Sequence, residues 1–551
     1  MSRFNHQKYR PFAFAPHLPD RTWPDKTITK APTWVSVDLR DGNQALIDPM
    51  TIEQKLRFFQ LLVDCGFKEI EIGFPSASQI EYDFTRLLIE GGHIPDDVTI
   101  QVLVQAREHL IDRTFESLRG VKRAIVHLYN PTSRVQREKV YEKSKEDITA
   151  IAVAGATLLQ ERAARYPDSE WIFEYSPESF SQTETDFAVA VCEAVCRVWQ
   201  PWAGRKVILN LPNTVEACTP NRYADQIEYF CRHLGCREHI TLSVHTHNDR
   251  GCAVAAGELA VMAGADRVEG TLLGNGERTG NMDIMVMAMN LYSQGVDPKL
   301  DFSRMNDIVR IVSECNNLPV HPRHPYIGEL VFTAFSGSHQ DAIKKSLEKP
   351  QEDGIWDIAY LPIDPLDIGR SYQDVVRINS QSGKGGVAYI LARDYGLNVP
   401  RWLQIDFAQH VQKESERTQK ELSSRDIITL FEDSYLHDSP LHLDDYAIRR
   451  LERQDHHLEA NLTRTDGGSI TLKGHGGGAM GAFIDALQQH SGKRISVANY
   501  AEHAMSKTTD AQAVAYVQLM IDDALHTGIA YSQDTVSAML RATLVAAGHI
   551  L

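Results

Sequence analysis

The chain has 551 residues, 43% of them hydrophobic and 24% charged, and its formal net charge at pH 7 is −16. That length is too great for one hydrophobic core, so about two to four domains are expected. The negative charge argues against nucleic acid or an anionic membrane as the main partner. No apolar run is long enough to span a membrane and no apolar signal region begins the chain. None of the eight cysteines belongs to a Cys-x-x-Cys pair, which fits a reducing cytoplasm as the expected location.

After an N-terminal extension over residues 1–32, one rhythm repeats through residues 33–298. Short β-rich runs end in polar, Gly or Pro residues, and each is followed by an amphipathic stretch of helical length. Eight such units in about 260 residues predict a (β/α)8 TIM barrel as the catalytic domain. A doubly wound sheet is the alternative, but no G-x-G-x-x-G follows the first strand. The eight runs are TWVSVDLRDG, EIEIGFPSAS, VTIQVLVQ, AIVHLYN, WIFEYSPES, KVILNLPNT, ITLSVHTHND and RVEGTLLGNG.

Three of the predicted barrel helices carry start signals. Thr51 with Gln54, and Ser78 with Glu81, fit the capping box, in which two side chains satisfy free backbone amides at the helix start. Pro220 occupies a first-turn position, where its missing N–H leaves no hydrogen bond unmade. These signals place helices between the predicted strands.

The rest of the chain shows two other patterns. Residues 299–425 break into helical and irregular pieces, which we interpret as linker subdomains. Within them NSQSGKGG resembles a phosphate-binding loop only superficially, because Ile378 and Gly385 stand where that loop needs Gly and Ser or Thr. Residues 426–551 show three β-rich runs and a helix, twice over, which predicts an α+β regulatory domain of duplicated βββα units. Such a module is typical of ligand sensing or dimerisation.

Polar residues gather where the predicted barrel strands end. In a TIM barrel the carboxyl ends of the strands form the face that carries the active site. A structural protein has no reason to direct so many functional groups to one rim, so we expect an enzyme. The residues that end or follow the runs are Arg40, Asp41, His127, Glu174, Glu178, Asn210, Asn213, Thr214, His245, His247, Asn275, Glu277 and Asn281.

The seventh run contains HTHND, with His245 and His247 two residues apart. Side chains alternate along a strand, so both imidazoles are expected on the same face, about 7 Å apart along the backbone. Two imidazoles on one face can share a metal ion. Taken alone, the pair also fits two hydrogen-bonded histidines at a strand end.

Three segments belong together: LRDGNQAL at the first strand end, HTHND at the seventh and GNGERTGN after the eighth. With FSGSHQDAIKK, NSQSGKGG and the C-terminal module, they resemble the acetyl-CoA-dependent Claisen-condensing barrels, and most closely the α-isopropylmalate synthases of leucine biosynthesis. The likeness covers nearly the whole chain. Homocitrate synthases, citramalate synthases and hydroxymethylglutaryl-CoA lyases share the barrel and its motifs. The resemblance to α-isopropylmalate synthases therefore rests on all of these segments together and not on any single motif.

The resemblance implies a divalent metal held by Asp41, His245, His247 and Asn281. These nitrogen and oxygen donors suit Zn²⁺, Mg²⁺ or Mn²⁺, and the absence of a thiolate argues against a closed structural zinc site. Open positions would remain for a 2-oxo acid, bound through its keto oxygen and one carboxylate oxygen. A monovalent cation such as K⁺ is implied as an activator.

The implied reaction condenses acetyl-CoA with 3-methyl-2-oxobutanoate and water to give 2-isopropylmalate and CoA. Arg40, beside a metal ligand, would stabilise the alkoxide that develops on the keto oxygen, although it also fits a salt bridge at the barrel mouth. A positioned base is worth about a hundred- to ten-thousandfold in forming the enolate. By resemblance the catalytic residues are Arg40, Glu178, His339 and Tyr372, and the substrate contacts are Leu103, His127, Ser176 and Thr214.

Two of these catalytic residues lie outside the predicted barrel. His339 and Tyr372 match side chains that the family brings to the active site from the neighbouring subunit, so the resemblance implies a homodimer. Each also fits an ordinary hydrogen-bonded surface group, and Glu178 also fits a loop carboxylate in solvent.

Related functions need different residues. Homocitrate synthase must hold a second carboxylate, whereas the aliphatic Leu103 favours a branched apolar substrate. The lyases of this barrel group are commonly shorter and lack the C-terminal module. Metal-dependent amidohydrolases place H-x-H after the first strand instead of the seventh. A leucine sensor with a decayed barrel would not keep the full set of ligands and acid–base groups.

The resemblance also implies that the C-terminal module binds leucine as a feedback inhibitor, with Tyr500 in the regulatory site. Glycines between Gly474 and Gly481 free the backbone for a tight turn into a helix, whose first amides can meet a carboxylate. The family's turn is closer to GNGP, whereas this chain has GHGGGAMGA. The same glycines also fit close packing between the two halves of the module.

Overall fold

The computed structural model describes residues 5–349, 354–372, 384–418, 420–450, 455–505 and 512–551. Contacts divide the chain into two compact units. The first comprises Met1–Val331 with Pro365–Arg370, and the second comprises Phe332–Asp364 with Ser371–Leu551. The segment NSQSGKGG, compared above with a phosphate-binding loop, lies mostly outside the described residues.

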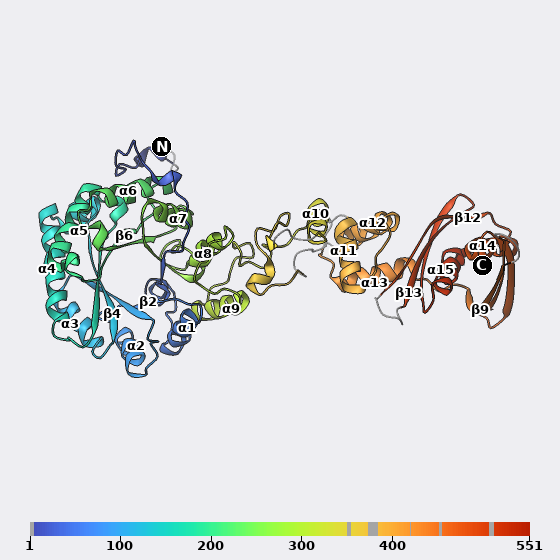
Figure 1. The fold of residues 1–551 in the computed structure, drawn as a ribbon, viewed down its shortest axis with the longest axis horizontal. Helices are drawn as coiled ribbons and strands as arrows, with labels where there is room; N and C mark the ends of the chain where they lie inside the picture. Colours follow the sequence, from blue (N-terminus) through green and yellow to red (C-terminus); the bar gives the residue numbers. More distant parts are fainter. Residues whose placement is uncertain (1–4, 350–353, 373–383, 419, 451–454, 506–511) are drawn as a thin grey trace. The chain divides into compact units, whose positions relative to one another are not determined.

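The first unit is built around a closed barrel of eight strands, which confirms the predicted (β/α)8 fold (Figure 1). The strands are β1 (Thr33–Ser36), β2 (Glu69–Gly73), β3 (Thr99–Gln105), β4 (Arg123–Pro131), β5 (Glu170–Glu178), β6 (Val207–Asn213), β7 (Thr241–Thr246) and β8 (Arg267–Gly270). Consecutive strands pair in parallel, and β8 pairs with β1 to close the ring. Each predicted run forms one of these strands.

Helices, most of them amphipathic, surround the barrel, because an apolar helix face needs burial. They are α1 (Ile52–Asp64), α2 (Gln79–Glu90), α3 (Glu108–Ser117), α4 (Lys145–Ala163), α5 (Thr185–Trp199), α6 (Pro220–His233), α7 (Ala253–Ala263), α8 (Ile284–Tyr292) and α9 (Met305–Asn316). In α1, for example, Phe58, Phe59 and Leu62 are buried. The segment before β1 is also anchored, because Arg21 and Trp23 donate to Asp225 of α6 at 2.8 and 3.0 Å.

All three predicted helix starts are confirmed, but only one of the two predicted capping boxes forms completely. The capping box at Thr51 forms completely, and Pro220 occupies the first turn of α6. At α2, Ser78 accepts from the amide of Glu81, but the Glu81 carboxylate does not complete the box. It binds Lys55 Nζ at 2.5 Å instead, because Lys55 is fully buried and needs a counter-ion.

The barrel interior changes from apolar to polar toward the carboxyl ends of the strands. One isoleucine each from β4, β5 and β6 forms a small buried cluster. Two positions further along these strands stand His127, Glu174 and Asn210, all of them buried. Branched apolar residues usually fill such an interior, and buried polar groups require partners. The buried side chains of this polar layer therefore need partners from neighbouring strands.

The second unit contains a group of helices and the predicted βββα repeat (Figure 1). Its elements are α10 (Gly337–Leu347), α11 (Lys384–Tyr395), α12 (Arg401–Thr418), α13 (Ser424–Tyr435), β9 (Leu441–Arg450), β10 (His456–Arg464), β11 (Ser469–Gly476), α14 (Ala479–Ser491), β12 (Ile495–Ala504), β13 (Ala513–Ile521), β14 (Ala524–Ser532) and α15 (Thr535–Ala547). Strands β9 to β11 and β12 to β14 form two antiparallel sheets, each followed by one helix. Apolar residues of both halves share one core, so the duplicated α+β domain is confirmed.

Two glycines allow β11 to lie close to α14. A Cβ at Gly474 would come within 2.1 Å of the Ala482 carbonyl oxygen, and one at Gly476 within 2.6 Å of the Ala482 nitrogen. Close packing therefore explains these two positions, although it occurs within one βββα unit and not between the halves. Gly477 and Gly478 have open space around them and lead into α14.

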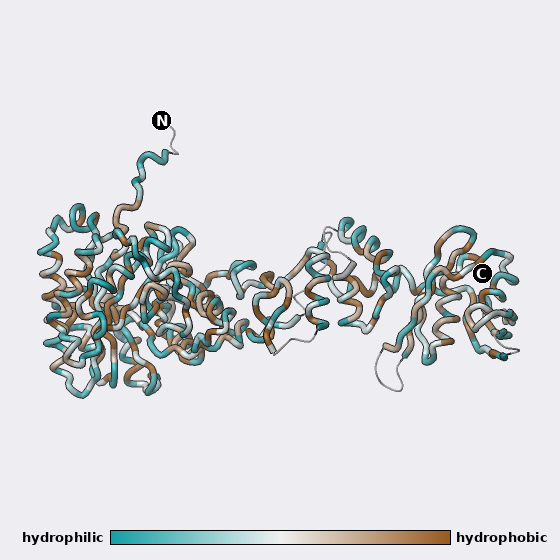
Figure 2. The backbone as a smooth tube through the Cα atoms, turned by 45° about the horizontal axis from the view of Figure 1, so that its top comes forward, coloured by the Kyte–Doolittle hydropathy of each residue, from teal (hydrophilic) through white to brown (hydrophobic). Residues whose placement is uncertain are grey.

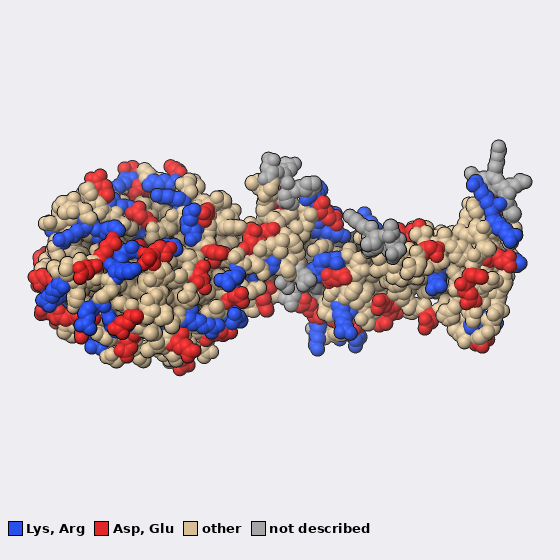
Figure 3. Space-filling view, turned by 60° about the horizontal axis from the view of Figure 1, so that its bottom comes forward, with Lys and Arg blue, Asp and Glu red and all other residues tan. Residues whose placement is uncertain are grey.

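Among the described residues, no helix is both long enough and apolar enough to cross a membrane. Hydrophobic and hydrophilic stretches alternate closely along the chain in Figure 2. On the face of the barrel that Figure 3 shows, basic and acidic side chains are interspersed. Charge of one sign is therefore not concentrated on that face.

Candidate active site

Most of the predicted functional side chains meet at a cavity of about 270 Å³ at the carboxyl ends of the barrel strands. The predicted residues in its wall are Arg40, Asp41, Leu103, His127, Ser176, Glu178, Thr214, His245 and His247. The wall also contains Asn210 and Glu277, two of the polar residues predicted at this rim, and Gln44, Phe74, Tyr129, Pro212 and Arg278. The barrel thus brings together residues that lie far apart in the sequence.

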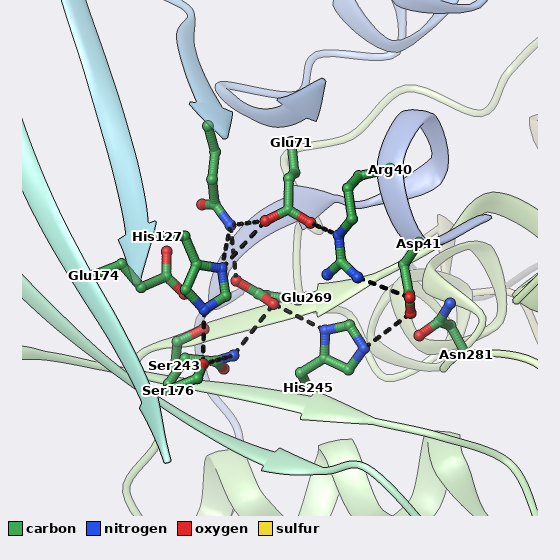
Figure 4. A network of polar contacts seen from close by, with 12 residues as sticks. Arg40, Asp41, Glu71, His127, Glu174, Ser176, Ser243, His245, Glu269 and Asn281 are labelled. Carbon is green, nitrogen blue, oxygen red and sulfur yellow. Dashed lines mark hydrogen bonds and ion pairs between the residues drawn. The ribbon is translucent and has the colours of Figure 1, made fainter. Parts of the chain in front are cut away.

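Three predicted metal ligands, Asp41, His245 and His247, converge at one point of this cavity, and Figure 4 shows Asp41 and His245 facing each other. The Nε2 atoms of His245 and His247 lie 3.3 Å apart, and they lie 3.3 and 3.5 Å from Asp41 Oδ2. His245 belongs to β7, whereas His247 follows the strand and pairs with Asn281 in an isolated bridge. The two imidazoles therefore face the same side, as their spacing predicts.

A tight loop after β8 positions Asn281. Its backbone amide donates to the Gly274 carbonyl, and its Nδ2 donates to the Asn275 carbonyl, both at 3.0 Å. The loop requires glycine at position 280, where φ is 99° and a Cβ would lie 2.0 Å from the Gly274 oxygen. Because Nδ2 is engaged, Oδ1 is the atom free to bind a ligand, and Figure 4 shows this side chain beside Asp41.

Arg40 and Asp41 do not end the first strand, contrary to the sequence prediction. They lie in a helical turn, η3 (Asp38–Gly42), that follows β1. The turn is held because Asp38 accepts the backbone amide of Leu272 at 3.1 Å, which ties the end of β1 to the end of β8. Both functional side chains project from this turn into the cavity wall.

The donor set fits a divalent metal ion. Asp41 Oδ2 and Asn281 Oδ1 are buried and have no hydrogen-bond partner among the described residues. Buried polar atoms normally have partners, so these oxygens favour a cation. An ion about 2.1 Å from each donor needs donors about 3.0 to 3.4 Å apart in octahedral or tetrahedral geometry, close to the spacing seen here. Imidazole, carboxylate and amide donors suit Zn²⁺, Mg²⁺ and Mn²⁺.

Neighbouring charges also favour a cation at this point. Burial disfavours ionised Asp41, but the adjacent Arg40 guanidinium and His245 hold the pKa of that carboxyl well below its usual range. Burial disfavours protonated His245, yet the neighbouring carboxylates of Asp41 and Glu269 raise its pKa to about 9. Burial and the charge of His245 lower the pKa of His247 to about 4. The two carboxylates therefore stabilise positive charge where the ligands meet.

Arg40 connects the proposed ligands with the other side of the cavity. Its Nη1 donates to Asp41 Oδ1 at 2.7 Å, and its Nε donates to Glu71. The other oxygen of Glu71 lies 3.2 Å from His127 Nδ1. Arg40 therefore forms salt bridges at the barrel mouth and also lines the cavity.

His127 and Ser176 form a hydrogen-bonded pair in the cavity wall. His127 Nε2 lies 2.7 Å from Ser176 Oγ, and Asn210 Nδ2 donates to the same oxygen at 3.0 Å. The prediction that His127, Glu174 and Asn210 end their strands is wrong. They lie within β4, β5 and β6, because each strand continues for several residues beyond them.

Three more predicted residues complete the wall. Glu178 is half-buried at the end of β5 and not in a solvent-exposed loop, and its burial raises the pKa of the carboxyl. Thr214 Oγ1 accepts from the amide of Ser179 at 2.9 Å. Leu103, on β3, is 8% exposed and gives the wall an apolar surface.

The remaining predicted residues belong to the second unit. His339, on α10, is exposed and stacks on Tyr360 with ring centroids 4.0 Å apart. Tyr372 donates to Asp364 Oδ1 at 2.9 Å. Tyr500 is 41% exposed on β12. These residues therefore lie in a different compact unit from the barrel cavity.

Sequence reasoning missed part of the polar layer below the cavity. Glu71, Gln101, Arg267 and Glu269 are all fully buried there, on β2, β3 and β8. The available signal is the alternation in EIEIG, TIQVLVQ and RVEG, where polar residues share one face of an otherwise apolar strand. In a closed barrel that face is the interior.

Family models match the chain in three consecutive parts. The model described as HMGL-like matches residues 31–312. One described as alpha-isopropylmalate synthase, post-catalytic domain-like, matches residues 329–392, and one described as LeuA allosteric (dimerisation) domain matches residues 421–551. The fold and the matches thus define an HMGL-like barrel enzyme that carries two further domains.

Relatives of similar length narrow this class. Over 551 residues the chain is 54% identical to the 2-isopropylmalate synthase of Alcanivorax borkumensis, covering 99% of this chain and 98% of that one. It is 53% identical to the 2-isopropylmalate synthase of Azotobacter vinelandii, with 99% and 97% covered. For that of Rhodospirillum rubrum the identity is 54%, with 99% and 98% covered. The chain belongs to the 2-isopropylmalate synthase family.

Proposed function

We propose that the protein condenses acetyl-CoA with 3-methyl-2-oxobutanoate and water to give 2-isopropylmalate and CoA, the first committed step of leucine biosynthesis, in the cytoplasm. The observation that carries the proposal is the convergence of Asp41, His245 and His247 in a chain that aligns over 99% of its length with a 2-isopropylmalate synthase. The apolar Leu103 in the cavity wall supports a branched aliphatic oxo acid.

The proposed metal ligands are Asp41, His245, His247 and Asn281, and the ion is Mg²⁺, Mn²⁺ or Zn²⁺. When bound, the ion acts as a Lewis acid that polarises the keto group of the oxo acid. The chain's own contribution is a set of donors held in place before binding, with Asn281 oriented by its bond to a backbone carbonyl. Such preorganisation reduces the cost of binding.

Arg40 stabilises the negative charge that develops on the keto oxygen. Its guanidinium is fixed between Asp41 and Glu71, so little reorganisation is needed as charge develops. Among the other contacts, His127, Ser176 and Thr214 hold the polar end of the oxo acid, and Leu103 contacts its branched side chain.

Glu178, His339 and Tyr372 supply the acid–base chemistry in this proposal. Burial raises the pKa of Glu178, which suits a carboxyl group that takes part in proton transfer. His339 and Tyr372 serve the barrel of the neighbouring subunit in a homodimer. A positioned base is worth about a hundred- to ten-thousandfold in removing a methyl proton of acetyl-CoA.

Release of free thiol from acetyl-CoA should depend on the structure of the 2-oxo acid. In a panel we expect 3-methyl-2-oxobutanoate to give the highest kcat/KM, because Leu103 offers an apolar contact. We expect 2-oxoglutarate to be at least about tenfold poorer, since its second carboxylate would be desolvated against that surface. A strong preference for 2-oxoglutarate or pyruvate would instead indicate a homocitrate or citramalate synthase. Replacing Na⁺ by K⁺ in the assay should raise turnover if a monovalent cation is an activator.

Leucine should bind the intact protein and inhibit it. We propose residues 426–551 as the regulatory domain, after a catalytic barrel at 33–298 and linker subdomains at 299–425. Tyr500→Ala should weaken inhibition about tenfold, within the usual range of coupling between two sites, and leave turnover without leucine unchanged. Leu525→Ala, also exposed and in the same sheet, is the matched control. If calorimetry detects no leucine binding and millimolar leucine leaves turnover unchanged, the regulatory proposal is wrong.

A further inference from the structure

A buried glutamate contacts the proposed metal ligand His245 from behind. Glu269 Oε2 lies 2.8 Å from His245 Nδ1, while Nε2 of the same ring faces Asp41 at 3.3 Å (Figure 4). Glu269 is fully buried on β8. A histidine that binds a metal through Nε2 carries its proton on Nδ1. Glu269 therefore stands where an acceptor for that proton is required.

The neighbours of Glu269 restrict it to the role of acceptor. Arg267 Nη1 and Gln101 Nε2 donate to Oε1 at 2.7 and 3.3 Å. Asn210 Nδ2 donates to Oε2 at 3.4 Å, beside the contact with His245. An ionised carboxylate accepts at both oxygens and so satisfies all these donors. Because Arg267 stays protonated, it always presents a hydrogen-bond donor to Oε1, and Oε1 must accept.

Arg267 is itself held from several sides. Its Nε donates to Glu69 at 2.6 Å, its Nη1 donates to Ser243 Oγ at 2.8 Å, and its Nη2 donates to Gln101 Oε1 at 2.5 Å. Arg267 is fully buried, so these bonds fix the guanidinium with little freedom to move. Through Arg267, Glu269 is thus held by the barrel interior below the cavity.

The same layer contains a second group with the chemistry of a cation site. Atoms of His127, Glu174 and Glu269 lie within 4.8 Å of one another. Arg267, however, lies 3.3 Å from Glu174 and 2.7 Å from Glu269 through Nη1. Because the guanidinium already supplies the positive charge, we assign this group to the support of the site and not to a second metal.

We propose that Glu269 is a positioning residue that fixes the tautomer and the ring orientation of His245 for the metal, and that Arg267 holds Glu269 in place. The inference rests on the proposed metal site. Partners that orient a ligating histidine contribute about 10- to 100-fold to metal affinity. The effect belongs to metal binding and is therefore measurable without turnover.

Glu269→Gln tests this role because it keeps the shape of the side chain. The new amide must direct its NH₂ either at Arg267 and Gln101, which already donate there, or at His245. In the second case NH₂ donates to Nδ1, and the ring proton moves to Nε2, the atom that should bind the metal. We expect chelator-stripped E269Q to bind Mn²⁺ about 10- to 100-fold more weakly than wild type in calorimetry.

Glu69→Gln is the matched control. It removes the same charge from the same partner, but among the contacts of the described residues Glu69 binds Arg267 and no proposed metal ligand. We expect its Mn²⁺ affinity to stay within about twofold of wild type. Wild-type affinity in E269Q, or equal weakening in E69Q and E269Q, would overturn the proposal. If E269Q fails to fold, Glu269→Asp keeps the charge but withdraws the oxygens from His245, so it should show the same loss.

Asp41→Ala separates this inference from the proposed site. If D41A binds Mn²⁺ as wild type does, the ion is not held at the proposed ligands, and the proposed site and this inference both fail. If D41A abolishes binding while E269Q binds normally, only the role of Glu269 is wrong. Thermal unfolding of the metal-free variants checks that each has kept its fold.

Discussion

Replacing His245 with alanine should lower metal-supported turnover by about a thousandfold or more. The change removes one of the two imidazoles that face Asp41, and a Lewis acid contributes several kcal/mol to such a reaction. Chelator-stripped wild-type protein should recover thiol release with Mg²⁺, Mn²⁺ or Zn²⁺, whereas the stripped variant should not. The fold should persist, because Glu269 keeps Arg267 as its counter-ion.

His93→Ala is the matched control for this substitution. His93 is exposed and precedes β3, so it lies on the amino-terminal side of the barrel, away from the cavity. After chelator treatment, the His93→Ala variant should recover thiol release with added metal as wild-type protein does. High turnover of the His245 variant at saturating metal, or full activity of stripped wild-type protein, would contradict the proposed metal site.

Mixing inactive His339→Ala chains with inactive Asp41→Ala chains should restore about a quarter of wild-type activity. In a symmetric dimer with shared sites, about half of the dimers are mixed, and each mixed dimer contains one intact site. The expectation follows because the proposal places His339 and Asp41 at one site from different subunits. Thiol release after subunit exchange measures it.

The control for this experiment mixes Asp41→Ala with His245→Ala. Both lesions then fall on the barrel, so no dimer contains an intact site. Exchange itself is demonstrated with two affinity tags. If the first mixture stays at the level of this control despite exchange, each chain supplies its own His339.

The barrel and the C-terminal repeat were predictable because their signals are local. Alternation with a period of two marks a strand, and an apolar stripe marks a helix, within one run of the chain. The spacing of His245 and His247 is a signal of the same kind, since two residues along extended backbone return to the same face. The Thr51 capping box also needs no distant partner.

The turn that carries Arg40 and Asp41 could not be predicted in this way. TWVSVDLRDG reads as one extended run, yet β1 stops at Ser36. The helical turn after it depends on Asp38 accepting the amide of Leu272, which lies 234 residues further along the chain. A contact over that separation exists only after β8 has closed the barrel against β1.

The sequence by itself determined the eight βα units, the duplicated C-terminal domain, and the kinds of side chain available for a metal and an oxo acid. Only the tertiary structure decided that Asp41, His245 and Asn281 meet, and that Glu269 stands behind His245. The physical reason is that a pattern of period two identifies a face of a strand but not the strands that adjoin it. Barrel closure brings those strands together, and each charge buried in the process then needs a partner from another strand.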